Sequence, residues 1–231
     1  TPNTNTITYN SNGATSGSVP ANGTHVTGST ALTVAANTGN LAKTGSTFTG
    51  WNTAADGTGT SYLANGSSTL TTTQDLTLYA QWRANTYSYT YQLNGGTSTA
   101  PASGTVLHAE TITVASTPVR DGFTFAGWND GTANRNAGSV ISVTSNLIFV
   151  AQWTAQSFAI NYLPNYSGAT ETMSAGSYVS GGVPHVIANS GFSRSGYRFD
   201  NWNTQADGTG TAFISGAGYS TSANLTLYAQ W

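Results

Sequence analysis

The sequence predicts a mainly β protein built from three small modules in tandem. Two tryptophan-containing landmarks occur three times along the 231 residues, and apolar residues near them alternate with polar ones at the period of two typical of strands. The first landmark is Phe48–Asn52, Phe125–Asn129 and Phe199–Asn203, and the second is Leu76–Trp82, Leu147–Trp153 and Leu225–Trp231. All six tryptophans fall at these positions, which indicates one repeated unit rather than a single large domain.

The landmarks place the modules at residues 4–82, 83–153 and 154–231. Only a few residues separate each closing tryptophan from the next opening strand, which is too short for a flexible tether. We therefore expect neighbouring modules to stack end to end. A module of this length is roughly 30 Å across, so the prediction is an elongated rod of roughly 90 Å.

Each module is expected to open with a strand. In the first module Ile7 and Tyr9 alternate with polar residues, and equivalent alternation starts at Tyr87 and at Phe158. These strands end near glycines, which supply the positive φ of a hairpin turn. The glycines are Gly13, Gly95, Gly96 and Gly168.

A central strand carries the Phe-x-Gly-Trp landmark. Phe48 and Trp51 fall on opposite strand faces, so a bulge near Gly50, and near Gly127 in the second module, is expected to turn both aromatics inward. The segments 52–59 and 203–210 then predict a hairpin turn. Because modules this small have little else to fill a core, all six tryptophans are predicted to be core residues.

The last strand of each module follows a turn residue, which is Asp75, Asn146 or Asn224. No stretch of 10 to 12 residues shows apolar residues at helical spacing. We therefore expect at most one short helix in each module.

The composition excludes several classes of function. Charged residues are 6% of the chain, the net charge is -2 and the six Lys and Arg are scattered, so a nucleic-acid or anionic-membrane surface is not expected. Without cysteine the chain has no disulfides, thiolate metal sites or thiol nucleophiles. No apolar run reaches 18 residues, so no membrane insertion by this segment is predicted. With neither signal peptide nor anchor, the sequence is expected to be a fragment of a longer protein.

The landmarks resemble the Listeria–Bacteroides repeat, also known as the internalin B-type B repeat. The matching residues are Asn94-Gly95-Gly96 after the opening strand, Arg120 and Gly122 before Phe125-Ala126-Gly127-Trp128, and Leu78–Trp82 at the close. The sequence departs from the family pattern at Ser46 and Asn201, and the second module lacks the Ala-Asp-Gly-Thr-Gly hairpin. The resemblance implies β-grasp-like modules, in secreted bacterial surface proteins, that serve as stalk or adhesive segments and have no catalytic residues.

Catalysis and metal binding have weak support in the residues. Few of the acids recur at equivalent places in all three modules, and the histidines His25, His108 and His185 do not, so turn acids and incidental surface histidines explain them and no enzyme is predicted. A calcium site at Asp56 or Asp207 would have one carboxylate where calcium prefers several, so neither a metal nor another cofactor is predicted. Lys43 aligns with Arg120 and Arg194, which favours a packing or turn-capping role.

The leading hypothesis is a non-enzymatic segment of an extracellular, bacterial cell-surface protein, acting as adhesin or stalk in cell attachment. Its partner would be a cell-surface glycan or protein, and the oligomeric state is open. The rival hypothesis is a glycan-binding region with a pocket in the third module, where the pattern of the repeat is broken. The ligand-binding residues predicted for that pocket are Tyr166, Tyr178 and His185.

Overall fold

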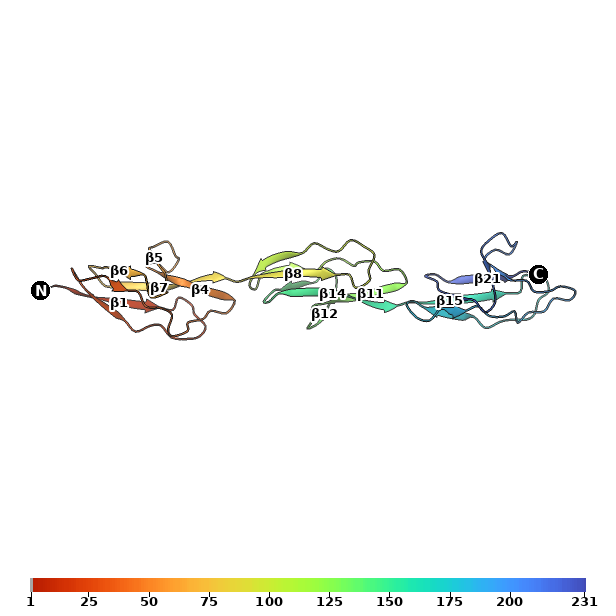
Figure 1. The fold of residues 1–231 in the computed structure, drawn as a ribbon, viewed down its shortest axis with the longest axis horizontal. Coiled ribbons are helices and arrows are strands. Elements are labelled where there is room, and N and C mark those ends of the chain that lie inside the picture. The colour runs from red at the N-terminus through yellow and green to blue at the C-terminus, as the bar shows by residue number, and fades with distance from the viewer. Residues whose placement is uncertain (1) are drawn as a thin grey trace. The chain divides into compact units, whose positions relative to one another are not determined.

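The computed structural model describes residues 2–231, and every regular element in that range is a strand (Figure 1). The mainly β prediction is confirmed, with three similar modules, and the short helix allowed for each module does not form in the described range. The β-grasp-like description, the rod and the module boundaries stay predictions. The chain divides into two compact units, one of Thr1–Tyr89, Ser103–Ile112 and Val140–Leu147 and the other of Thr90–Ala102, Thr113–Ser139 and Ile148–Trp231.

The first unit holds the five-stranded sheet of the N-terminal module, in the order β2-β1-β7-β4-β5. The first and last long strands, β1 and β7, lie side by side and parallel, and the other neighbours are antiparallel. A two-stranded sheet of β3 and β6 completes the module. The strands are β1 (Thr4–Asn10), β2 (Gly23–Val26), β3 (Leu32–Thr33), β4 (Ser46–Asn52), β5 (Ser61–Tyr62), β6 (Thr69–Leu70) and β7 (Leu76–Ala84).

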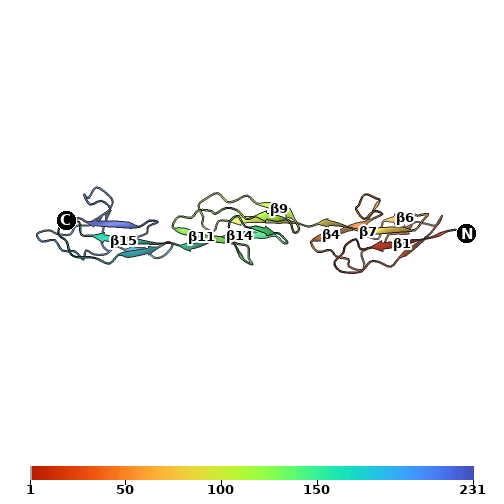
Figure 2. The ribbon, with the colours of Figure 1, turned by 180° about the vertical axis from the view of Figure 1, so that it is seen from behind.

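The second unit holds the C-terminal module, whose sheet has the same arrangement. Its order is β16-β15-β21-β18-β19, again with the first and last strands parallel, and β17 pairs with β20. Its opening strand, β15, is labelled in Figure 2. The strands are β15 (Ser157–Leu163), β16 (Gly176–Val179), β17 (His185–Val186), β18 (Trp202–Asn203), β19 (Ala212–Phe213), β20 (Gly218–Tyr219) and β21 (Leu225–Ala229).

The middle module repeats the order as β12-β11-β14-β8-β9, with a second sheet of β10 and β13. Its strands are β8 (Thr86–Gln92), β9 (Gly104–Leu107), β10 (Thr111–Thr113), β11 (Phe123–Asn129), β12 (Asn134–Arg135), β13 (Val140–Ser142) and β14 (Leu147–Ala155). The order of neighbours is therefore a property of the repeat.

A tyrosine–tryptophan pair builds the core of each module. In the first module the Tyr9 and Trp51 ring centroids are 4.8 Å apart. The Tyr9 hydroxyl accepts the Ala35 N–H at 2.9 Å, and Trp51 Nε1 donates to the Ala35 carbonyl at 2.9 Å. The same bonds join Tyr91 and Trp128 to Ala115, and Tyr162 and Trp202 to Ala188. The backbone N–H and C=O of one half-buried alanine are thus both satisfied by two core aromatics.

The bulge predicted in the central strand is confirmed in two modules. The register with the neighbouring strand shifts between Phe48 and Gly50, and between Phe125 and Gly127. Phe48 consequently lies 5.3 Å from Trp51, centroid to centroid. The three tryptophans of this landmark are fully buried, whereas the three closing tryptophans are only half-buried. The prediction that all six lie in the core therefore holds fully for Trp51, Trp128 and Trp202.

The hairpin predicted after the opening strand is wrong. Asn12 and Gly13 do have positive φ, at 46° and 82°, but the antiparallel partner of β1 begins only at Gly23, after a long loop. The Asn12 side chain holds this loop, because its amide donates to the carbonyls of Ala55 and Ala80, both at 2.8 Å. Asn94 and Asn165 have the same conformation and bond equivalent carbonyls, so the positive φ fixes a loop rather than a hairpin.

Candidate functional site

Of the three predicted ligand residues, Tyr166 is half-buried in a loop of the third module. Its hydroxyl lies 2.6 Å from Glu171 Oε2 and 2.7 Å from the Ser193 carbonyl, and its ring meets the edge of Trp231 at 5.6 Å. The hydrogen bond to Glu171 raises the pKa of Tyr166, and the same bond lowers the pKa of Glu171. Tyr166 therefore ties two loops together at the edge of the module.

Tyr178 and His185 lie elsewhere in the same module. Tyr178 is 8% exposed and belongs to the hydrophobic core, so its ring offers no free face for stacking on a sugar. His185 is half-buried, and its Nε2 lies 3.1 Å from the Tyr162 hydroxyl, the group that also accepts the Ala188 N–H. The structure brings neither residue into contact with Tyr166.

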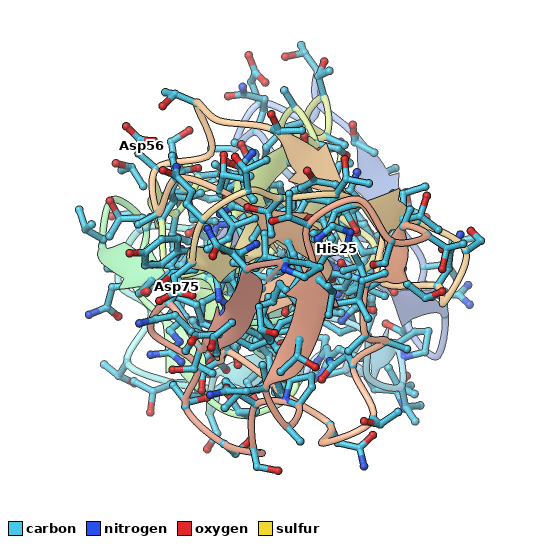
Figure 3. All side chains as sticks on the ribbon, turned by 90° about the vertical axis from the view of Figure 1, so that its left-hand side faces the viewer. His25, Asp56 and Asp75 are labelled. Atoms are coloured by element: carbon cyan, nitrogen blue, oxygen red, sulfur yellow. The ribbon has the colours of Figure 1, made fainter. Side chains whose placement is uncertain are left out.

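The histidine and acids labelled in Figure 3 belong to separate local structures. Asp75 Oδ1 accepts the Thr6 N–H at 2.7 Å, as Asn146 and Asn224 accept the equivalent amides of Ser88 and Ala159. His25 is buried, contrary to the surface position predicted for it, and its Nδ1 lies 3.0 Å from the Thr72 carbonyl. No group of three or more His, Asp or Glu residues in range to hold a metal ion occurs among residues 2–231.

The carboxylates of the predicted hairpin turns organise those turns. Asp56 Oδ1 accepts the hydroxyl and the N–H of Thr58, and these bonds lower the pKa of Asp56. Asp207 makes the same bonds with Thr209, and its pKa is lowered as well. The amide of buried Asn52 closes the turn from inside by donating to the Gly57 and Gly59 carbonyls.

The middle module makes this turn with fewer residues, around Asp130. Burial acts to raise the pKa of Asp130, but hydrogen bonds from Thr132, Ala133 and Arg135 outweigh it and hold that pKa well below its ordinary value. Arg135 Nε lies 2.8 Å from Asp130 Oδ2, in the only ion pair found within residues 2–231. All these carboxylates therefore act as structural acceptors.

Two joints, where one module continues into the next, share one pattern of hydrogen bonds. At the first joint the Asn85 N–H donates to the Gly45 carbonyl at 2.9 Å, and the Asn85 carbonyl accepts the His108 N–H at 2.8 Å. At the second joint Gln156 takes the place of Asn85. It donates to the Gly122 carbonyl at 2.9 Å and accepts the Ser180 N–H at 3.0 Å.

Side chains reinforce both joints. The Thr47 hydroxyl donates to Asn85 Oδ1 at 2.6 Å, and Gln156 Nε2 donates to the Thr124 hydroxyl at 3.0 Å. Glycine is required at positions 45 and 122 for two reasons. Gly45 and Gly122 have φ of +66° and +77°, which side chains disfavour. In addition, an added Cβ would overlap the His108 ring at Gly45 and Ser180 Oγ at Gly122. Sequence reasoning missed the joints, although the recurrence of Gly45, Gly122 and Gly196 three residues before the aromatic of each landmark is visible in the sequence.

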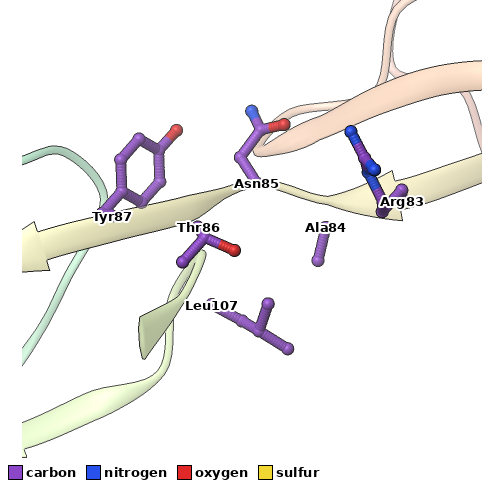
Figure 4. A pocket seen from close by; sticks show the side chains of 6 residues that line it. All are labelled: Arg83, Ala84, Asn85, Thr86, Tyr87 and Leu107. Atoms are coloured by element: carbon purple, nitrogen blue, oxygen red, sulfur yellow. The ribbon is translucent and has the colours of Figure 1, made fainter. Parts of the chain in front are cut away.

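A groove of about 600 Å³ lies beside the first joint (Figure 4). One side of the strand carries the side chains of Arg83, Asn85 and Tyr87. The other side carries those of Ala84 and Thr86, which point toward Leu107. Arg83 is exposed and forms no ion pair within the described chain, and Leu107 is 44% exposed. The joint therefore offers a cation, an amide, an aromatic ring and an aliphatic group within a few residues.

The comparisons with known proteins agree with the repeated architecture. The family model of the Listeria-Bacteroides repeat domain matches three times, at residues 6–81, 87–152 and 158–230. No helix in residues 2–231 has the length and apolar character needed to cross a bilayer.

Three relatives illustrate where such sequences occur. A protein of Evansella cellulosilytica, provisionally named a Gly-rich membrane protein, is 31% identical over 98% of this chain and 26% of its own length. Another protein of that organism, provisionally named a membrane protein, is 30% identical over 71% of this chain and 25% of its own length. Internalin H of Listeria monocytogenes is 36% identical over 38% of this chain and 15% of its own length. The chain thus spans about a quarter or less of the length of these relatives.

Proposed function

Because the chain belongs to the Listeria-Bacteroides repeat family, we propose that it is a non-enzymatic repeat region of a secreted bacterial surface protein. The relatives support an envelope location, since two have names of membrane proteins and the third is an internalin. Within that protein the region acts as an adhesive stalk in cell attachment, outside the cell.

The observation that carries the stalk part of the proposal is the repeated joint. Asn85 and Gln156 each bond backbone groups of the module before and the module after, and each glycine contact leaves no space for a side chain. A spacer needs such connections, because a flexible tether would let its modules fold back on one another.

The adhesive part of the proposal rests on the groove at the first joint. An unpaired arginine, an amide and a tyrosine ring are groups that bind the carboxylates, hydroxyls and apolar faces of sugars. At the second joint the equivalent residues are Thr154, Gln156 and Phe158, so only the first joint has the cation. We propose that the ligand is an acidic glycan of a cell surface.

Binding of the labelled chain to a glycan array and to intact cells, with and without calcium, tests this function. The expected result is saturable, calcium-independent binding to a restricted set of acidic sugars, lost in Arg83→Ala and kept in the matched variant Thr154→Ala. Binding that is absent at high concentration would reduce the function to that of a spacer. Binding that survives Arg83→Ala would place the adhesive surface elsewhere.

A second candidate is glycan binding in the third module, favoured by a hollow of about 300 Å³ next to Tyr166. Asn161, Glu171 and Thr172 line it with an amide, a carboxylate and a hydroxyl, the groups that bind neutral sugars. Tyr178 is not part of this proposal because it is buried, and His185 is absent from the lining. Loss of binding to a neutral sugar in Glu171→Gln, but not in Glu110→Gln, is the expected result, and equal binding by both variants would contradict it.

A further inference from the structure

Four asparagines of the chain are followed directly by glycine, and one of these pairs, Asn65-Gly66, lies in an exposed turn between β5 and β6 of the first module. An asparagine before glycine is able to react with its own backbone. The next peptide nitrogen reaches the side-chain carbonyl carbon, and glycine has no side chain to block the approach. How fast this reaction runs depends on how the fold holds the two groups.

The turn holds the Asn65 side chain over the peptide that follows it. Asn65 Oδ1 accepts the Ser67 N–H at 3.1 Å and the Ser67 hydroxyl at 2.6 Å. A side-chain oxygen bonded to the amide two residues ahead folds back over the intervening peptide, which brings Cγ of Asn65 toward the nitrogen of Gly66. The Gly66 N–H has no acceptor among residues 2–231, and Gly66 has φ of +75° with open space around it. The attacking nitrogen is therefore unrestrained.

The same two hydrogen bonds favour the reaction chemically. When the Gly66 nitrogen adds to Cγ of Asn65, negative charge develops on Oδ1, the atom that already accepts both donors of Ser67. Donors directed at an oxygen lower the barrier when charge develops there, because their bonds strengthen as the charge grows. The amide nitrogen of Asn65, which has to leave, donates to no group in the described part of the chain.

The other three asparagine–glycine pairs are held differently. The amide nitrogens of Asn12 and Asn94, which would have to leave as ammonia, donate to backbone carbonyls of the fold at 2.8 to 3.0 Å. The remaining pair is Asn22-Gly23, and Gly23 belongs to β2, where its backbone pairs with Ile7. The fold therefore restrains the leaving group in two pairs and the attacking peptide in the third.

The turn is also suited to the product of the reaction. Asp56 makes the same turn in the same module, since its Oδ1 accepts the N–H and the hydroxyl of Thr58 at 3.1 and 2.7 Å. The glycines of the two turns, Gly57 and Gly66, have φ of +83° and +75°. A carboxylate at position 65 thus finds the same two donors, and as a charged acceptor it binds them more strongly than an amide does.

We propose that Asn65 is a modification site at which the chain deamidates itself. The Gly66 nitrogen attacks Cγ of Asn65 and loses its proton to hydroxide. The bond from Cγ to Nδ2 breaks, and Nδ2 takes a proton from water and leaves as ammonia. Water then opens the cyclic imide at either of its carbonyl carbons, which gives aspartate or isoaspartate. The first module thereby gains a negative charge with age, and because no ligand is involved, this inference is independent of the adhesive function.

Peptide mapping by mass spectrometry, after ageing the folded chain in buffers of neutral and mildly alkaline pH, tests the proposal. Aspartate and isoaspartate are heavier than asparagine, so the map assigns each conversion to one of the four pairs. We expect conversion at Asn65 to be at least about tenfold faster than at Asn12, Asn22 and Asn94. The rate should rise with pH, because the attacking nitrogen must lose a proton. In urea, where the fold is lost, the four rates should become similar.

Ser67→Ala removes the hydroxyl donor and is expected to slow the conversion about fivefold, the effect of one ordinary hydrogen bond. Ser29→Ala changes an exposed serine of the same module and is the matched control, with no effect expected. Asn65→Asp supplies the product and should keep the melting curve of the wild type. Conversion at Asn65 no faster than at Asn94 in the folded chain would overturn the proposal. A rate that Ser67→Ala leaves unchanged would overturn the role of the hydroxyl.

Discussion

Alanine at Gly122 and at Gly196 provides a matched pair that isolates the contribution of a joint. Both glycines lie in the same turn, with φ of +77° and +78°. Each substitution therefore carries the same left-handed backbone strain, about 1–2 kcal/mol. Only at Gly122 does the new Cβ overlap Ser180 Oγ and come within 3.0 Å of Ser180 Cβ, whereas Gly196 has open space.

The difference in stability between the two variants follows from the hydrogen bonds that the joint loses in Gly122→Ala. To relieve the overlap, Gly122 and Ser180 have to move apart, and because each is bonded to the backbone of Gln156, we expect this separation to break the two bonds. A backbone hydrogen bond contributes about 0.5–1.5 kcal/mol net, so Gly122→Ala should cost about 1–3 kcal/mol more than Gly196→Ala in the opening free energy of the joint.

Native-state hydrogen exchange at the amides of Gln156 and Ser180 measures this difference directly. We expect faster exchange at both amides in Gly122→Ala and no change in Gly196→Ala, and the double variant Gly122→Ala with Ser180→Gly should recover most of the protection at residue 156. Ser180→Gly alone is the control for the loss of that side chain. Identical exchange in the two alanine variants would refute the steric account of the joint.

Three further predictions concern single residues. Asp130→Asn should cost about 1 kcal/mol at neutral pH through its lost ion pair and hydrogen bonds. Folding lowers the pKa of Asp130, so the extra stability of the wild type over Asp130→Asn is present above the ordinary carboxyl pKa and disappears as the pH falls through the lower folded value. If this were wrong, urea titrations at several pH values would show a difference in free energy of unfolding that does not change with pH. Asn94→Ala should cost about 2 kcal/mol through strain at φ +48° and a lost hydrogen bond, and Asn94→Gly only about 1 kcal/mol; equal melting curves would contradict the role of φ. Tyr162→Phe should cost about 1–3 kcal/mol because the Ala188 N–H loses its acceptor, and unchanged urea denaturation would argue against it.

The sequence could predict which faces of the strands are buried, because apolar and polar residues alternate along each strand and the apolar ones mark the buried face. Phe48 and Trp51 stand three residues apart with a glycine between them, and the bulge is the way to bury both. Asp75, Asn146 and Asn224 were predicted as turn residues and are found capping equivalent amides. The parallel pairing of β1 with β7 could not be predicted, because a period of two does not identify the neighbouring strand.

The candidate site was harder to predict for a different reason. Tyr178 aligns with His25, two residues after the glycine that opens β2 or β16, and both side chains are buried. Treated as a residue outside the repeat, Tyr178 was instead predicted to be free for a ligand. The joints depend on contacts between residues far apart in the sequence, such as Gly45 with His108. The spacing of residues within one repeat does not predict such contacts.

The parallel placement of the first and last strands has a mechanical consequence. In the first module β1 and β7 are adjacent over Ile7–Asn10 and Leu76–Tyr79, and in the third module β15 and β21 are adjacent in the same way. A pull on the two ends of such a module slides these strands past each other, so the hydrogen bonds between them are loaded together in shear. A hairpin pulled at its open end breaks its bonds one at a time. These modules therefore resist tension that is applied between their two ends.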